Sequence, residues 1–119
     1  MRERFMSDFQ ITNEEMKANK AKIIELLKST NRPGMDRLIS WIETTDFFEA
    51  PASTKYHLHC KGGLAKHSLN VYERLKAKVD CGLVNLKPET IIITSLLHDL
   101  CKANYYTVDY RNKKVWKFG

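Results

Sequence analysis

The sequence predicts a mostly α-helical protein of one domain that ends in a β-hairpin. Apolar residues recur at helical spacing in several segments, and proline and glycine turn signals separate these segments. The last stretch, 105–119, instead alternates and is rich in aromatic residues. A length of 119 residues fits a single domain with a modest core. We divide it into an N-terminal helix (1–33), core helices (34–104) and the hairpin (105–119).

The composition excludes disordered and membrane-spanning classes. The chain is 43% hydrophobic and 29% charged, as ordinary globular proteins are. No apolar run approaches the roughly 20 residues that cross a bilayer, and the charged start "MRERFMSDFQ" is unlike a signal peptide. The three cysteines include no CxxC pair and fit reduced thiols. We therefore expect a cytoplasmic protein with no membrane partner.

The net charge of +6 is compatible with an anionic partner, such as a nucleotide or a nucleic acid. The lysines are dispersed, however, as in "MKANKAKIIELLK" and "ERLKAK". Solvated helix faces account for most of them.

The first two helices have clear local signals. Thr12 is a candidate N-cap, and Glu15 stands at the position of a capping box. Ile23, Leu26 and Leu27 supply the apolar face of this helix, which "NRPG" ends. The segment "MDRLISWIETT" predicts a second helix, whose inward residues are expected to be Leu38, Trp41 and Ile42.

The next two helices are separated by a turn. "DFFEAPASTKYHLHCKGG" predicts a structured loop, and a third helix is expected from about Leu64 to Val79. After the turn "DCGLVNLKP", Pro88 suits the first position of a fourth helix, which contains "IIITSLLHDLCK".

The fourth helix is expected to carry a narrow polar stripe. At about 100° per residue, Ser95, His98, Asp99 and Lys102 share one sector of it, whereas most of the remaining circumference is apolar. Burying a carboxylate and an ammonium is costly unless they pair or bind a metal. The stripe therefore needs a partner.

His67 on the third helix is the candidate partner. If the third and fourth helices pack together, His67 can approach His98 and Asp99. Two imidazoles and one carboxylate suit a divalent ion. Lys102 lies one turn from Asp99 and could reach a substrate phosphate beside the ion. The alternatives are a helix-end hydrogen bond for His98 and Asp99, and a favourable dipole interaction for Lys102.

The residues resemble a known family. "AKHSLN" followed by "LLHDLCK" is similar to the HD-domain metal-dependent phosphohydrolases, whose pattern is a histidine, a His-Asp pair and a distant aspartate. The stretch "APASTKYHLHCKGGLAKHSLNVYERL" also resembles HD domains of bacterial and phage hydrolases and of some 3′-to-5′ exoribonucleases. The resemblance covers roughly Trp41 to Tyr110.

The resemblance implies an HD-like helical bundle and a role for each matching residue. His67, His98 and Asp99 would bind a divalent ion (Mn, Ni, Fe or Mg), Asp99 and Lys102 would be catalytic, and Lys102 and His57 would contact the substrate. The implied activity is hydrolysis of a phosphoester in a nucleotide or nucleic acid, because such an ion lowers the pKa of a water molecule and polarises a phosphoryl oxygen.

The sequence departs from the family pattern at its end. Asp109 is the only aspartate after Asp99, and it lies in the predicted hairpin rather than on a late helix. We therefore expect the domain to be incomplete at its C-terminus, as a fragment, a naturally shortened form with a weak metal site, or a protein that obtains its last ligand from elsewhere. A missing segment would leave apolar surface for self-association. Lys61 and Lys66 make the expected pocket entrance basic and disfavour a second metal. Two alternatives to the enzyme remain: an incomplete module that binds a metal or an anion without turnover, and a purely structural domain.

Overall fold

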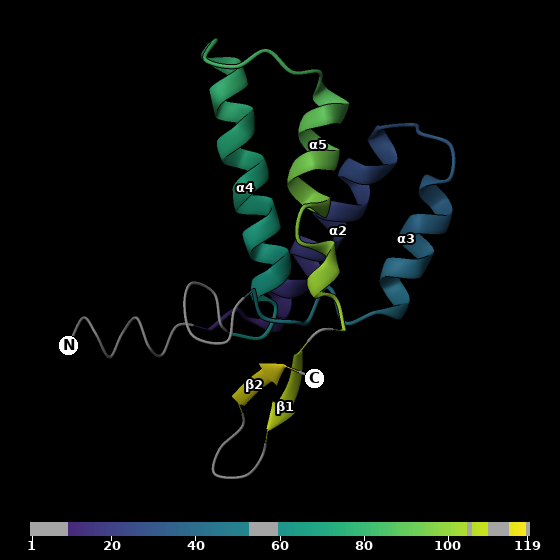
Figure 1. Ribbon diagram of the computed structural model, residues 1–119, viewed down its shortest axis with the longest axis vertical. Helices are drawn as coiled ribbons and strands as arrows, with labels where there is room; N and C mark the ends of the chain where they lie inside the picture. Colours follow the sequence, from purple (N-terminus) through teal and green to yellow (C-terminus); the bar gives the residue numbers. More distant parts are fainter. Residues whose placement is uncertain (1–9, 53–59, 105, 110–114, 119) are drawn as a thin grey trace, which may run out of the picture.

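The computed structural model describes residues 10–52, 60–104, 106–109 and 115–118. Its elements, in chain order, are helices α2 (Asn13–Ser29), α3 (Met35–Thr44), α4 (Gly63–Asp80) and α5 (Pro88–Leu97), the 3₁₀ helix η1 (Leu100–Lys102), and strands β1 (Tyr106–Asp109) and β2 (Val115–Phe118). Figure 1 shows α4 and α5 side by side, with α2 behind them and α3 on the far side of α2. No helix in these ranges combines the length and the apolar character that crossing a bilayer requires.

The helix starts follow local chemistry. The Thr12 hydroxyl oxygen accepts a hydrogen bond of 3.0 Å from the Glu15 backbone N–H, which confirms the predicted N-cap of α2. Pro88 lies at the first turn of α5, as expected, because its missing N–H would have no partner there. The start of α4 differs, because Gly62 caps it with a positive φ of 82°. A left-handed backbone conformation suits glycine far better than residues with a Cβ atom.

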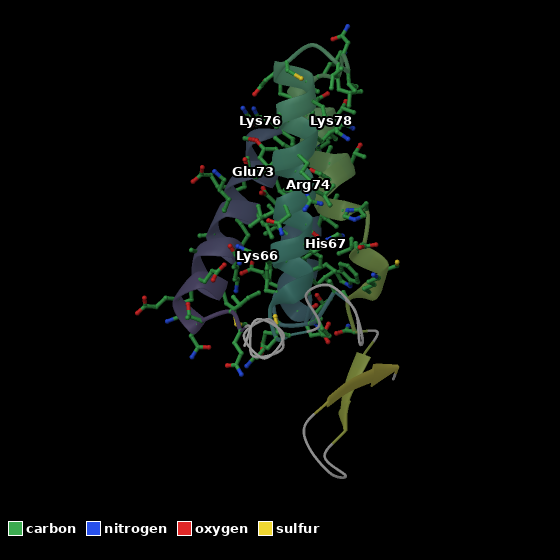
Figure 2. The ribbon with its side chains drawn as sticks, turned by 90° about the vertical axis from the view of Figure 1, so that its left-hand side faces the viewer. Lys66, His67, Glu73, Arg74, Lys76 and Lys78 are labelled. Atoms are coloured by element: carbon green, nitrogen blue, oxygen red, sulfur yellow. The ribbon has the colours of Figure 1, made fainter. Side chains whose placement is uncertain are left out.

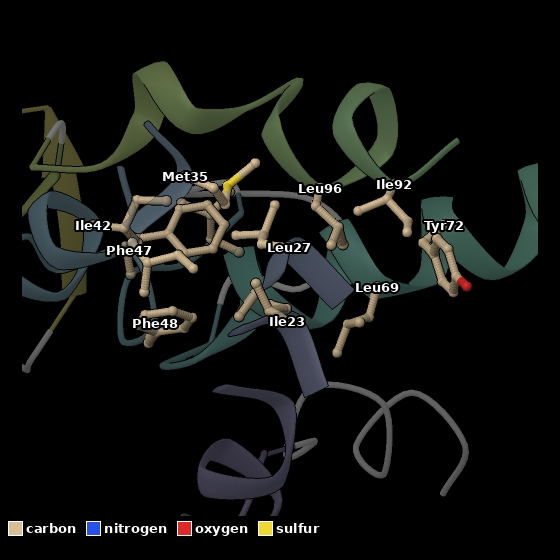
Figure 3. Packing of buried hydrophobic residues seen from close by; sticks show 14 of the residues in the cluster. Ile23, Leu27, Met35, Ile42, Phe47, Phe48, Leu69, Tyr72, Ile92 and Leu96 are labelled. Carbon is tan, nitrogen blue, oxygen red and sulfur yellow. The ribbon is translucent and has the colours of Figure 1, made fainter. Parts of the chain in front are cut away.

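The core lies where α2, α4 and α5 meet. The most extensive contact between two helices is that of α4 with α5, and α2 packs against both. Figure 3 shows side chains from all four long helices and the α3–α4 loop in one cluster. Its most deeply buried members are Ile23, Leu27, Ile42, Phe47, Leu64 and Leu96. The prediction that Trp41 faces inward is wrong, since Trp41 is 50% exposed. Loop residues Phe47 and Phe48 fill the apolar space near α3 instead.

The predicted fold class, a helical bundle with a C-terminal β-hairpin over 105–119, requires correction. β1 and β2 pair antiparallel, with Tyr106 opposite Phe118, but among the described residues neither strand forms an extensive interface with a helix. Figure 1 places the pair beyond one end of the bundle, and 110–114 lies outside the described residues. Because two strands without a second layer bury little apolar surface, the hairpin was wrongly counted as part of the packed fold. That fold is all-α.

Candidate metal centre

Three predicted ligands meet beside one end of the α4–α5 interface. His67 lies in the second turn of α4, and His98 and Asp99 follow the last residue of α5. His67 Nε2 is 3.6 Å and His98 Nε2 is 3.2 Å from the same oxygen, Asp99 Oδ2. One ligand atom from each of the three residues lies within 4.8 Å of the others. The structure therefore brings together the residues that the sequence placed on separate helices.

The predicted polar stripe on one continuous helix is wrong. α5 ends at Leu97, and Asp99 has φ −110° and ψ 20°, outside the helical region. His98 Nδ1–H donates a hydrogen bond of 2.7 Å to the Ser95 carbonyl oxygen, which a continuing helix would need as an acceptor. Ser95 is fully buried, and its hydroxyl donates to the Ile91 carbonyl oxygen. Ser95 thus contributes a carbonyl that orients His98, and its side chain does not join the cluster.

The hydrogen bond of His98 determines which ring nitrogen can bind a cation. Because Nδ1 donates to a carbonyl oxygen, Nε2 of the neutral imidazole carries a lone pair. This lone pair faces Asp99 Oδ2, so two hydrogen-bond acceptors lie 3.2 Å apart. Such an arrangement favours a positive species between them. A ring nitrogen whose partner nitrogen donates to a carbonyl is also the usual form of a metal-binding histidine.

The donor set fits a divalent ion. In a tetrahedral site with ligand bonds of about 2.1 Å, ligand atoms are about 3.4 Å apart. The separations of 3.2 and 3.6 Å from Asp99 Oδ2 to the two imidazole nitrogens lie close to that value. Two imidazoles with one carboxylate suit Fe²⁺ or Ni²⁺ better than Mg²⁺, which prefers oxygen ligands.

Lys102 contacts the protein on two sides. Its Nζ donates a hydrogen bond of 2.9 Å to the Ala52 carbonyl oxygen and lies 3.6 Å from Asp99 Oδ2. The ammonium thus balances the carboxylate and fastens η1 to the α3–α4 loop. Contact with a substrate phosphate, which the sequence predicted for Lys102, requires its Nζ to share or leave the Ala52 carbonyl.

Two further residues bear on the candidate site: the predicted residue His57, and Arg74 on α4. His57 lies outside the described residues. Arg74 is exposed, and it forms no ion pair within the part of the chain that the structure describes. Figure 2 shows Arg74 beyond His67 on the flank of α4 that faces α5, whereas Lys66 and Lys76 lie on the opposite flank. These two lysines pair with Glu15 and Asp80, so Arg74 is the better placed of the three to meet an anion near the cluster.

Sequence reasoning missed a pair of residues that joins the chain after η1 to the α3–α4 loop. The Asp46 backbone N–H donates a hydrogen bond of 3.1 Å to Asn104 Oδ1, and the Asn104 backbone N–H donates to Asp46 Oδ1. Asn104 has a positive φ of 60°. An asparagine next to "YY" and an aspartate after "TT" are turn signals, but nothing in the sequence indicates that they bond each other.

A cavity of about 600 Å³ lies elsewhere, at the α2–α3 connection. Its lining includes Lys28, Arg32 and Arg37 but none of the cluster residues. We therefore do not assign it to the candidate metal centre.

Comparisons of the chain with protein-family models, curated proteins and solved structures gave no match.

Proposed function

We propose that this chain is an HD-type metal-dependent phosphohydrolase that acts on a phosphoester of a nucleotide or nucleic acid. The observation that supports this proposal is the convergence of His67, His98 and Asp99, with Asp99 Oδ2 3.6 and 3.2 Å from the two imidazole nitrogens. The resemblance of "AKHSLN" and "LLHDLCK" to the HD pattern links these same residues to hydrolysis.

In this proposal the three side chains hold a divalent ion. The ion, when bound, supplies Lewis acidity toward a phosphoryl oxygen and lowers the pKa of water. The Ser95 carbonyl keeps the His98 lone pair on Nε2, directed at the cluster. Lys102 offsets the charge of Asp99, and because its ammonium has three N–H donors, it would contact a substrate phosphate while keeping its hydrogen bond to the Ala52 carbonyl.

The charges around the cluster support an anionic substrate. The chain carries a net charge of +6. Arg74 extends the cationic surface along α4 from the cluster, two helical turns or about 10 Å from His67. A guanidinium forms paired hydrogen bonds with phosphate oxygens. We therefore assign Arg74 to a part of the substrate next to the scissile phosphate, and a cytoplasmic location agrees with such a substrate.

The second candidate function is a module that binds a metal or an anion without turnover. One observation favours it: the Lys102 ammonium is already hydrogen-bonded to Ala52 at 2.9 Å. Only three candidate ligands gather among the described residues, so the distant aspartate of the HD pattern has no counterpart there.

Metal analysis and an activity screen test both functions. The wild type, His98→Ala and Asp99→Asn are compared, with Asp80→Asn as a control that removes an exposed carboxylate from the far end of α4. We expect metal to co-purify with the wild type and the control only. Equal metal content in His98→Ala contradicts the assigned centre.

Turnover decides between the two functions. Phosphodiester and nucleotide substrates are screened with Mn²⁺, Ni²⁺, Fe²⁺ and Mg²⁺. Hydrolysis that is lost in Asp99→Asn and retained in Asp80→Asn supports the enzyme. Stoichiometric metal binding without hydrolysis of any substrate supports the binding module.

A further inference from the structure

The segment that follows α5 is fastened to the α3–α4 loop at two points. The first is the reciprocal pair of hydrogen bonds between Asp46 and Asn104. The second is the hydrogen bond from Lys102 Nζ to the Ala52 carbonyl oxygen. Both join residues that are far apart in the chain: Asp46 and Asn104 are 58 positions apart, and Ala52 and Lys102 are 50 positions apart. Asp99 lies just before this fastened segment.

The first part of the α3–α4 loop, residues 45–52, is firmly held. Phe47, Ala50 and Ala52 are buried in it, at 1%, 0% and 5% exposure. The loop also binds the start of α4, because the Gly62 and Leu64 N–H groups donate to the Glu49 and Ala50 carbonyl oxygens at 2.8 and 2.9 Å. Residues 45–52 therefore contact both the helix that carries His67 and the turn that carries Asp99.

The Asp46–Asn104 pair restricts the turn more than a single hydrogen bond would. Each residue uses its backbone N–H as donor and its side-chain oxygen as acceptor, so the two bonds together oppose both sliding and rotation. Asn104 has φ 60°, a conformation that asparagine tolerates better than most residues. Between Asp99 and Asn104 the chain has its own short-range bonds, Lys102 N–H to Asp99 O and Ala103 N–H to Leu100 O, which transmit the restraint.

We propose that Asp46 and Asn104 are positioning residues of the candidate metal centre, and that their reciprocal hydrogen bonds set the place of Asp99 relative to the two imidazoles. The proposal rests on the proposed function, because it concerns affinity for a divalent cation. Asp46 is not among the residues whose ligand atoms gather at the cluster, and Asn104 Oδ1 accepts the Asp46 backbone N–H. They act through the backbone of η1.

The size of the effect follows from the tolerance of metal sites. Ligand distances must agree within about 0.2 Å, and removal of a group that orients a ligand typically lowers affinity by about 10-fold to 100-fold. Here the Lys102–Ala52 bond remains in place and retains part of the restraint. We therefore expect the lower end, a loss of about 10-fold.

The variants are chosen to separate positioning from stability. Asn104→Gly removes the side-chain acceptor and keeps the positive φ accessible, and Asp46→Ala removes the other acceptor. Asp46→Asn retains an oxygen at the same position and is the rescue variant. Glu89→Ala is the matched control, because the Arg32–Glu89 pair, at 3.4 Å and 57 positions apart, ties the opposite end of α5 to the α2–α3 connection.

Each variant is titrated with Mn²⁺ and Co²⁺, and its thermal unfolding is measured without metal. We expect Asn104→Gly and Asp46→Ala to bind about 10-fold more weakly, and Asp46→Asn and Glu89→Ala to bind like the wild type, while Glu89→Ala and Asn104→Gly lose similar stability. Wild-type affinity in Asn104→Gly overturns the inference, as does an equal loss in Glu89→Ala.

Hydrogen exchange separates this inference from the proposed function. We expect the Lys102 and Ala103 amides to exchange faster in Asn104→Gly than in the wild type and in Glu89→Ala, whether or not an ion binds. If the wild type binds neither ion, the proposed function fails, and unchanged exchange in Asn104→Gly then removes the positioning role as well.

Discussion

Substitution of Gly62 by alanine tests the packing that places the start of α4. Gly62 and Gly34 both cap a helix with positive φ, 82° and 83°, and neither has a side-chain capping bond. They differ in their surroundings. A Cβ atom on Gly62 would lie 2.9 Å from Met16 Cγ and 3.3 Å from Met16 Sδ, whereas nothing lies within 4 Å of one on Gly34.

The expected losses of stability follow from these two features. The positive φ costs an alanine about 1–2 kcal/mol at either position. At Gly62 the Met16 side chain must also rotate away, which costs about 0.5–1.5 kcal/mol for a displaced rotamer. Gly34→Ala therefore loses about 1–2 kcal/mol of unfolding free energy, and Gly62→Ala loses about 1.5–3.5 kcal/mol.

Urea unfolding of both variants measures the difference directly. A double-mutant cycle of Gly62→Ala with Met16→Ala isolates the steric part, and we expect a coupling of about 0.5–1.5 kcal/mol. If the two glycine variants lose the same stability and the cycle shows no coupling, the contact with Met16 does not constrain the start of α4, and the reasoning is refuted.

Three other substitutions or reactivities are predicted. Leu96 is 0% exposed, and Leu96→Ala is expected to lower the unfolding free energy, measured in urea, by about 2–5 kcal/mol. Leu83 is 76% exposed, and Leu83→Ala is expected to change it by less than about 0.5 kcal/mol. Similar losses in the two variants would contradict the assigned core. Burial raises the pKa of the Cys60 thiol, so less thiolate forms at this residue. Iodoacetamide is therefore expected to label Cys60 at pH 8 more slowly than the exposed Cys81, as measured by mass spectrometry. Equal labelling rates would contradict this prediction. In the proposed function the Arg74 guanidinium binds substrate away from the reacting atoms, so Arg74→Ala is expected to raise KM for a nucleotide substrate with kcat nearly unchanged. An unchanged KM removes this role.

Local signals in the sequence predicted where helices begin. Thr12 and Pro88 act on backbone groups of their own first turn, so their effect is visible in a short stretch of sequence. Helical periodicity likewise predicted the buried face of α2 that contains Ile23 and Leu27. It failed at Trp41, which lies about 100° around the helix from Ile42 and so outside the face of α3 that Met35, Ile39 and Ile42 bury.

The sequence predicted which residues form the candidate centre but not how they are arranged in space. The resemblance and the polar stripe identified His67, His98, Asp99 and Lys102. The stripe assumed a helix through Lys102, but α5 ends at Leu97, since the His98 imidazole takes the Ser95 carbonyl. The roles of these residues in metal binding and catalysis stay predictions.

The sequence by itself determined the helical composition, the helix starts and the residue types that gather at the cluster, because capping and periodicity act within a few residues. Only the tertiary structure decided the distances of 3.2 and 3.6 Å around Asp99, the engagement of Lys102 with Ala52 and the Asp46–Asn104 pair. These contacts join residues far apart in the chain, and their partners are selected by the packing of the α3–α4 loop against α4 and η1. The hairpin residues pair locally, but the packing that forms the bundle does not include them.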